Sequence, residues 1–232
     1  MTIQNQWIPE TALVIHRSGD NSSFAMTRHE VTTKGMGLGE YVSIEQCVSL
    51  LAQRSGKNEL APTLKPQYLL LNTDKGMLWY KPSHKGLLWF RYNNVELQLA
   101  VTYPALLFCL NSGNSPRLSV YALEGDTYPT QTSKIYNAPL MNVSINGVVC
   151  QGTASLPREI TPTQQCISQI EETIFNSYFT HVNNDKTLKS DKAVDTSDLV
   201  KFWQRKAKTS APVEMDELVF KGSVDDVINL LV

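Results

Sequence analysis

The segment from Tyr136 to Gly152 holds the residues best suited to covalent chemistry. Asn146-Gly147 is a tight-turn dipeptide, and it is followed by a short extended stretch that ends at Cys150. A cysteine thiolate is a nucleophile, so a thiol displayed on such a stretch could attack an acyl group. The alternative is that Cys150 is a small buried apolar residue, as single cysteines often are.

The remaining cysteines and the histidines are too dispersed to form a metal site or a dense disulfide framework. We expect Cys47 and Cys166 to lie in amphipathic helices and Cys109 in a buried strand, all as core residues. His181 follows a long predicted helix and is expected to cap its end, with a catalytic role as the alternative. These patterns favour a reduced, cytoplasmic protein without a metal or cofactor.

The composition limits the function classes. The chain has 232 residues, of which 42% are hydrophobic, and a formal net charge of −1. This content supports one large domain, or a smaller core with extensions. The neutral balance argues against a nucleic-acid partner held by overall positive charge, and no apolar run is long enough to span a membrane. We also expect no signal peptide at the N-terminus.

The N-terminal third predicts a β-hairpin and a helix. Residues 11–15 and 23–33 are strand-like and flank a turn. The glycine-rich stretch 34–39 is expected to be a flexible connector. Ser43 is a predicted helix N-cap, with Gln46 at the capping-box position. An apolar stripe follows at Val48, Leu51 and Ala52. The helix is expected to stop at Gly56 and Asn58.

The central and C-terminal parts predict an antiparallel sheet followed by helices. Residues 67–103 are β-like and rich in aromatics, which we interpret as cross-strand pairs, with single-stranded nucleic-acid binding as the alternative. Two further strands are expected at 105–110 and 118–123, followed by an irregular stretch to residue 157. A helix is predicted to begin at Thr161, with Ile167, Ile170 and Ile174 on one face. It is followed by a mobile polar linker over 183–196, a helix over 197–208 and a short helix from Ser223.

Asn142, Asn146-Gly147 and Cys150 resemble the active-site region of the ubiquitin-conjugating (UBC) superfamily, which carries His-Pro-Asn, a short loop and then the catalytic cysteine. The chain is more closely similar to the prokaryotic family D of this superfamily, known as PRTRC system protein B, over roughly residues 35–182. The matching text is Leu38-Gly39, Tyr68-Leu69-Leu70, Leu78-Trp79, Pro104 to Phe108, Tyr121-Ala122-Leu123, Tyr136 to Pro139, Asn142-Val143, Gly147 to Cys150 and Phe179-Thr180-His181.

The resemblance implies an α+β, UBC-like fold, with an antiparallel β-meander flanked by helices. It places an N-terminal β-hairpin extension at 1–42, the UBC-like core at 43–182, and a polar linker with C-terminal helices at 183–232. It implies that Cys150 carries a ubiquitin-like protein as a thioester and passes it to an amine. The implied partners are a ThiF-type activating enzyme, a small ubiquitin-like protein and a JAB-type peptidase of the same bacterial system.

The amides near Cys150 have more than one interpretation. Asn142 falls on the asparagine of the family and could stabilise the oxyanion that forms during transfer. It could equally brace the loop, and Asn137 could be the stabilising amide instead. Leu140-Met141 replaces the His-Pro pair of the UBC superfamily, and Leu156 stands near the place of its usual tryptophan. These departures motivate the alternative of a non-catalytic scaffold that binds the modifier or its activating enzyme.

Overall fold

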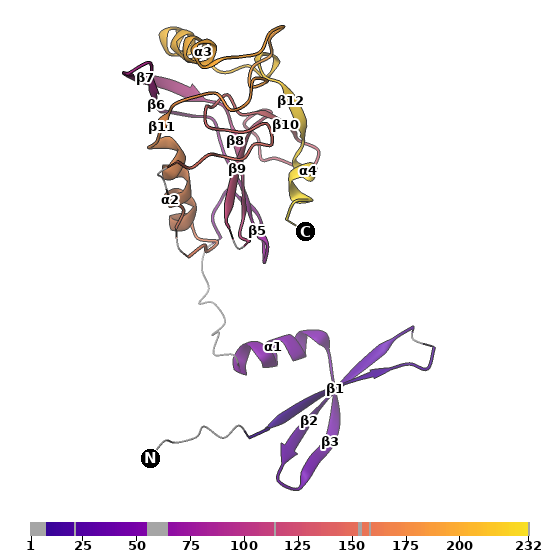
Figure 1. The fold of residues 1–232 in the computed structure, drawn as a ribbon. Helices are drawn as coiled ribbons and strands as arrows, with labels where there is room; N and C mark the ends of the chain where they lie inside the picture. The colour runs from indigo at the N-terminus through magenta and orange to yellow at the C-terminus, as the bar shows by residue number, and fades with distance from the viewer. Residues whose placement is uncertain are drawn as a thin grey trace, which may run out of the picture. The chain divides into compact units, whose positions relative to one another are not determined.

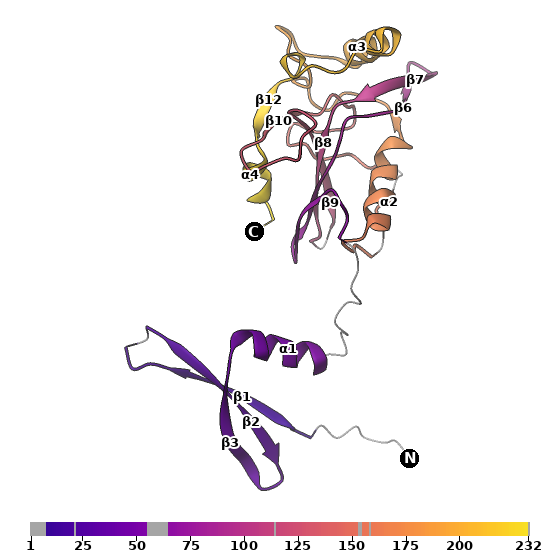
Figure 2. The ribbon, with the colours of Figure 1, turned by 180° about the vertical axis from the view of Figure 1, so that it is seen from behind.

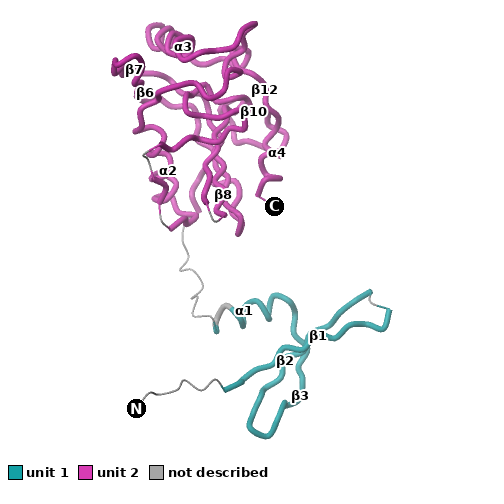
Figure 3. Tube along the Cα trace, in the orientation of Figure 1, with its two compact units in different colours: residues 1–64 teal, residues 65–232 magenta. Residues whose placement is uncertain are grey.

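The computed structural model describes residues 8–20, 22–54, 65–113, 115–152, 155–157 and 159–231. The chain forms two compact units, residues 1–64 and 65–232 (Figure 3). The division therefore falls after residue 64, whereas we predicted boundaries after residues 42 and 182. The first helix belongs to the N-terminal unit, where the buried thiol of Cys47 lies 4.0 Å from the sulfur of Met26.

The N-terminal unit is a three-stranded antiparallel sheet with one helix. Its elements are β1 (Thr11–Arg17), β2 (Phe24–Thr32), β3 (Gly35–Val42) and α1 (Ile44–Arg54). The predicted hairpin is present, but the prediction of a flexible connector over residues 34–39 is wrong, because most of this stretch belongs to β3. A Cβ on Gly39 would lie 2.5 Å from the His29 ring. Glycine here permits close packing against β2 rather than flexibility.

The helix α1 begins as predicted, although its apolar stripe is not buried. The Ser43 N–H donates to Gln46 Oε1 over 2.8 Å, and the Gln46 N–H donates to Ser43 Oγ over 3.2 Å. These two bonds form a capping box. Val48 and Leu51, which we expected to face a core, are 59% and 58% exposed. The predicted stop at Gly56 and Asn58 and the side chain of Ala52 lie outside the described residues.

The C-terminal unit is built on a six-stranded antiparallel sheet with the order β12-β10-β9-β8-β5-β4. Its strands are β4 (Leu69–Thr73), β5 (Gly76–Lys81), β8 (Leu106–Asn111), β9 (Arg117–Leu123), β10 (Lys134–Asn137) and β12 (Phe220–Ser223). The strands at 105–110 and 118–123 were predicted to within a residue or two. The sequence missed β10, within the irregular stretch, and β12, which completes the sheet edge.

A second small sheet comes from the aromatic stretch. It consists of β6 (His84–Tyr92), β7 (Val95–Tyr103) and β11 (Tyr178–Phe179), and β11 runs parallel to β6. The aromatic side chains of Trp79 and Phe90 are 0% and 1% exposed. They contribute to the core and offer no platform on which nucleic-acid bases could stack.

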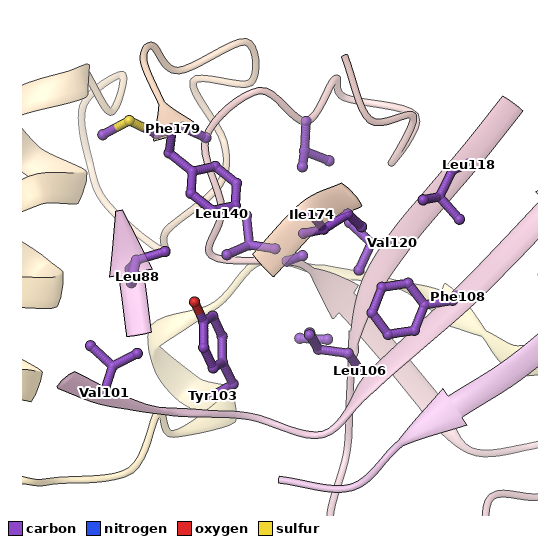
Figure 4. Close-up of a cluster of buried hydrophobic side chains, with 14 of the residues drawn as sticks. Leu88, Val101, Tyr103, Leu106, Phe108, Leu118, Val120, Leu140, Ile174 and Phe179 are labelled. Atoms are coloured by element: carbon purple, nitrogen blue, oxygen red, sulfur yellow. The ribbon is translucent and has the colours of Figure 1, made fainter. Parts of the chain in front are cut away.

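Helices cover both faces of the large sheet (Figures 1 and 2). These are α2 (Gln164–Phe175) on one face and α4 (Val224–Ile228) on the other, whereas α3 (Thr196–Thr209) packs against β7 of the small sheet and is followed by a 3₁₀ turn at Met215–Glu217. Because side chains alternate along a strand, each face carries its own cluster. Phe108 and Val120 pack with the isoleucines of α2 (Figure 4). Leu107 and Tyr121 belong to a second cluster, which includes Val224 and Val227 of α4. The fold is α+β with an antiparallel meander, as predicted.

Two C-terminal expectations need correction. The N-cap of α2 is Thr163, whose side chain accepts from the Cys166 N–H, so the helix begins two residues later than predicted. Residues 183–196 are not a mobile linker, because Asn184 and Thr187 are 4% and 2% exposed. The Thr187 hydroxyl donates to the Asn184 carbonyl over 2.6 Å, so local hydrogen bonds satisfy these buried polar groups.

Candidate active site around Cys150

The four cysteines differ in exposure. Cys47, Cys109 and Cys166 are buried, as predicted, whereas Cys150 is exposed. Burial raises the pKa of the Cys109 thiol to about 11, which disfavours its thiolate. Cys150 is therefore the thiol of this chain that a second protein could reach.

The turn before Cys150 is held against the large sheet. Gly147 has a φ of 81°, and a Cβ there would lie 2.5 Å from the Tyr121 ring. The Tyr121 hydroxyl donates to the Asn146 carbonyl over 2.9 Å. Val149, after the turn, forms an isolated antiparallel bridge with Val143, before the turn. A sheet residue and a glycine thus fix the short extended segment that the sequence predicted.

The backbone of Asn142 is hydrogen-bonded to both Cys150 and His181. The Cys150 N–H donates to the Asn142 carbonyl over 2.7 Å, and the Asn142 N–H donates to the His181 carbonyl over 2.9 Å. Asn142 has a φ of 56°, a left-handed conformation that asparagine tolerates better than most residues. The loop that bears Cys150 and the residues that follow β11 therefore meet at Asn142.

The Asn142 side chain is hydrogen-bonded to the first residue of β11 and to the residues that follow this strand. Its Nδ2 donates to the Tyr178 carbonyl over 3.2 Å. Its Oδ1 accepts from the N–H and the hydroxyl of Thr180, over 3.3 and 3.0 Å, and from the His181 N–H over 3.5 Å. These bonds brace the loop, which is one of the two roles that we expected for this amide. Its role as an oxyanion donor stays a prediction.

Asn137, the other candidate amide, lies in the core unit at the end of β10. Its side chain is 7% exposed and donates to the Lys186 carbonyl over 2.8 Å. It is not among the described residues that line the cleft at Cys150. In this structure it joins the sheet to the segment 183–196.

Cys150 lines an open cleft together with the end of α2, with β11 and with the residues that follow β11. The described residues that line the cleft are Arg91, Asn142, Val149, Cys150, Gln151, Gly152, Thr173, Ile174, Asn176, Ser177, Tyr178, Phe179, Thr180 and His181. The expectation that His181 caps the preceding helix is wrong, because α2 ends at Phe175 with Asn176 as its C-cap and β11 intervenes. Its position in the cleft makes His181 a functional candidate. Its only sequence signal was the matching text Phe179-Thr180-His181.

A charged pair stands at one side of this cleft. The Arg91 guanidinium lies 4.3 Å from the centre of the Tyr178 ring and 2.8 Å from Glu96 Oε1. The Tyr178 hydroxyl donates to Glu96 Oε2 over 2.9 Å. This hydrogen bond and those from Arg91 lower the pKa of the Glu96 carboxyl. Sequence analysis missed this group because its members come from three strands, β6, β7 and β11, and the last of these is distant in sequence.

The positions that depart from His-Pro are core residues here. Leu140 and Met141 are 2% and 0% exposed and belong to the main cluster. The indole N–H of Trp203 donates to the Pro139 carbonyl over 2.6 Å. The helix α3 thus supports the loop that leads to Asn142, and apolar burial helps to hold the loop in place.

Neither a metal site nor a membrane-spanning helix is found in the part of the chain that the structure describes. Within those residues, no group of three or more His, Cys, Asp or Glu side chains is placed to hold a metal ion. No helix among them combines the length and apolar character needed to cross a membrane.

The fold and the exposed cysteine beside an asparagine-bearing loop define a UBC-like protein. The chain matches the model of prokaryotic E2 family D over residues 44–219, which is more than half of its length, and it belongs to that family. This confirms the resemblance and the fold. The comparisons with curated proteins and with solved structures give no match. The family indicates a component of a ubiquitin-like conjugation system that interacts with a ubiquitin-like protein and an activating enzyme.

Proposed function

We propose that this protein is a bacterial, cytoplasmic conjugating enzyme that carries a ubiquitin-like protein as a thioester on Cys150. The observation that supports this proposal is that the Cys150 thiol is exposed and lines a cleft, whereas the other three cysteines are buried. The segment that bears Cys150 is hydrogen-bonded to a fixed loop, so the thiol occupies a defined place. A positioned and accessible thiol meets the minimum requirement of a thioester carrier.

The proposed reaction has two acyl transfers. In the first, the Cys150 thiolate attacks a thioester on a ThiF-type activating enzyme, a new C–S bond forms, and the thiol of that enzyme leaves. In the second, an amine attacks the new thioester, an amide C–N bond forms, and the Cys150 thiolate leaves. Because the modifier arrives already activated, Cys150 needs less activation than the nucleophile of a protease. We propose that a JAB-type peptidase of the same system removes the modifier.

A loading experiment tests this function. The protein is mixed with its activating enzyme, the modifier and ATP, and is analysed on a non-reducing gel. We expect an adduct that a thiol reductant releases, and a more stable ester or no adduct with Cys150→Ser. Cys166→Ala is the matched control, because it removes a buried thiol and keeps Cys150. An adduct that persists in Cys150→Ala would contradict the proposal.

A non-catalytic scaffold is the second candidate. It is favoured by the Leu140-Met141 pair in place of His-Pro and by the Asn142 amide, which is already bonded within the loop. A scaffold would bind the modifier or its activating enzyme without a covalent bond. Its affinity, measured by calorimetry, would be unchanged in Cys150→Ala, and no reducible adduct would form with the wild-type chain.

A further inference from the structure

Three side chains beside Cys150 form one continuous chain of hydrogen bonds. His181 Nδ1 lies 2.8 Å from the Thr180 hydroxyl oxygen, and that hydroxyl lies 3.0 Å from Asn142 Oδ1. His181 and Cys150 line the same cleft. The proposed thioester chemistry at Cys150 gives the imidazole no role so far.

Counting protons along this chain fixes the tautomer of the imidazole. The Asn142 atom that faces the Thr180 and His181 backbone N–H groups must be the amide oxygen, because both of those groups only donate. The Thr180 hydroxyl has a single hydrogen and gives it to that oxygen. Its oxygen must then accept from His181, so His181 Nδ1 carries a proton. In a neutral imidazole, Nε2 is therefore left with a free lone pair.

The backbone brings Cys150 and His181 to the two sides of one residue. Asn142 is hydrogen-bonded to Cys150 on one side and to His181 on the other. Cys150 and His181 are therefore each one backbone hydrogen bond away from the same residue. Both side chains face the cleft between them. This leaves room for an acyl carbonyl and an incoming amine.

We propose that His181 is the catalytic base for transfer from Cys150, and that Thr180 and Asn142 are positioning residues that hold its Nε2 unprotonated. As the amine nitrogen bonds to the thioester carbon, His181 Nε2 takes the amine proton. The C–S bond then breaks, and the imidazolium returns that proton to the departing Cys150 thiolate. The products are an amide and the free thiol. This inference rests on the proposed function, and it gives the Asn142 amide a role other than oxyanion donor.

The tautomer can be measured without any activity. Nitrogen-15 spectra of histidine-labelled protein, recorded at alkaline pH where imidazoles are neutral, distinguish a protonated Nδ1 from a protonated Nε2. His181→Gln assigns the signal. We expect a protonated Nδ1 in the wild type, a mixture in Thr180→Val, and restoration in Thr180→Ser. A protonated Nε2 in the wild type would overturn the hydrogen-bond chain.

The kinetics separate the base from the carrier. Cys150 is loaded by exchange with a small peptide thioester, which needs no partner protein, and is then discharged with ethylamine. We expect His181→Gln to load within about threefold of the wild type and to discharge ~10²–10⁴-fold more slowly. Unchanged discharge would overturn the role of His181. Failure of the wild-type Cys150 to load would overturn the proposed function, and with it the base.

One substitution distinguishes the two roles of Asn142. Asn142→Asp keeps an oxygen that accepts from Thr180 but removes the amide donor. If Asn142 positions His181, discharge should stay within about tenfold of the wild type, and Asn142→Ala should be slower. If the amide stabilises the oxyanion, Asn142→Asp should lose ~10²–10³ in rate, and the positioning role would be refuted.

Discussion

The two units of the chain bury their apolar side chains to very different extents. In the unit 65–232, two clusters fill both faces of the large sheet. Among residues 8–54 that are described, only Thr27 and Cys47 are buried. The same N-terminal stretch exposes Ile8, Ile15, Phe24, Met36, Leu38, Tyr41, Ile44, Val48 and Leu51.

This contrast shows that a correct pattern of strands and helices does not by itself make a core. A sheet gains stability when another layer covers its apolar face, at roughly 25 cal/mol for each Å² buried. In the C-terminal unit, α2 and α4 supply that layer on either face. In the N-terminal unit, α1 buries little besides Cys47, so we expect that unit to be the less stable one.

The largest difference should appear in hydrogen exchange. We expect the backbone amides of β8 and β9 to exchange only through global unfolding. The amides of β1, β2 and β3 should exchange faster by ~10²-fold or more, because few buried contacts oppose their local opening. Mass spectrometry of peptides from the full chain measures both. Equal protection of the two sheets would show that the N-terminal unit has a stabilising contact not visible in its own residues.

The next largest effect is expected for Trp203. This side chain is 0% exposed and donates to the Pro139 carbonyl. Trp203→Ala should lower the free energy of unfolding of the C-terminal unit by about 3–5 kcal/mol, through the cavity it leaves and the lost hydrogen bond. Chemical denaturation measures the loss.

Two matched variants complete this test. Trp203→Phe keeps most of the buried ring and removes the donor, so it should cost less than Trp203→Ala. Leu38→Ala removes an apolar side chain that is 97% exposed and should change stability by less than about 0.5 kcal/mol. A comparable loss from Leu38→Ala and Trp203→Ala would contradict the contrast between the units.

A smaller effect is expected at Gly147. Gly147→Ala forces a Cβ to within 2.5 Å of the Tyr121 ring at a φ of 81°. We expect a loss of about 1–3 kcal/mol and altered alkylation of Cys150 by iodoacetamide. Gly125→Ala is the matched control, because it also has a positive φ, 74°, but its Cβ would meet nothing within 4 Å. Equal effects of the two would show that backbone strain alone matters.

Local sequence signals were sufficient for several elements. The Ser43 and Gln46 capping box and the antiparallel strands around Cys109 were predicted because their determinants lie within a few residues. The burial of Cys47, Cys109 and Cys166 was also predicted, from their places in amphipathic helices and an apolar strand. For Cys150 the residues alone left burial open, and the interpretation as an active thiol rested on the family resemblance.

Other features depended on contacts between distant segments. The glycines of residues 34–39 gave a flexible signal, yet they lie in β3, which pairs with β2, and at Gly39 the His29 ring occupies the space that a Cβ would need. The polar stretch 183–196 looked mobile, yet Asn137 bonds to it from the sheet. His181 gained its importance when β11 paired with β6 and brought the imidazole to the cleft.

The sequence by itself determined the order of most strands and helices and the family, since these depend on local patterns and on matching motifs, whereas the exposure of the Cys150 thiol came from the structure. The tertiary structure decided which residues surround Cys150, because Arg91, Asn142 and His181 come from three separate parts of the chain. It also decided the hydrogen-bond partners of the Asn142 amide. An amide has a donor and an acceptor at once, and the groups that the fold brings to it determine which of them is used.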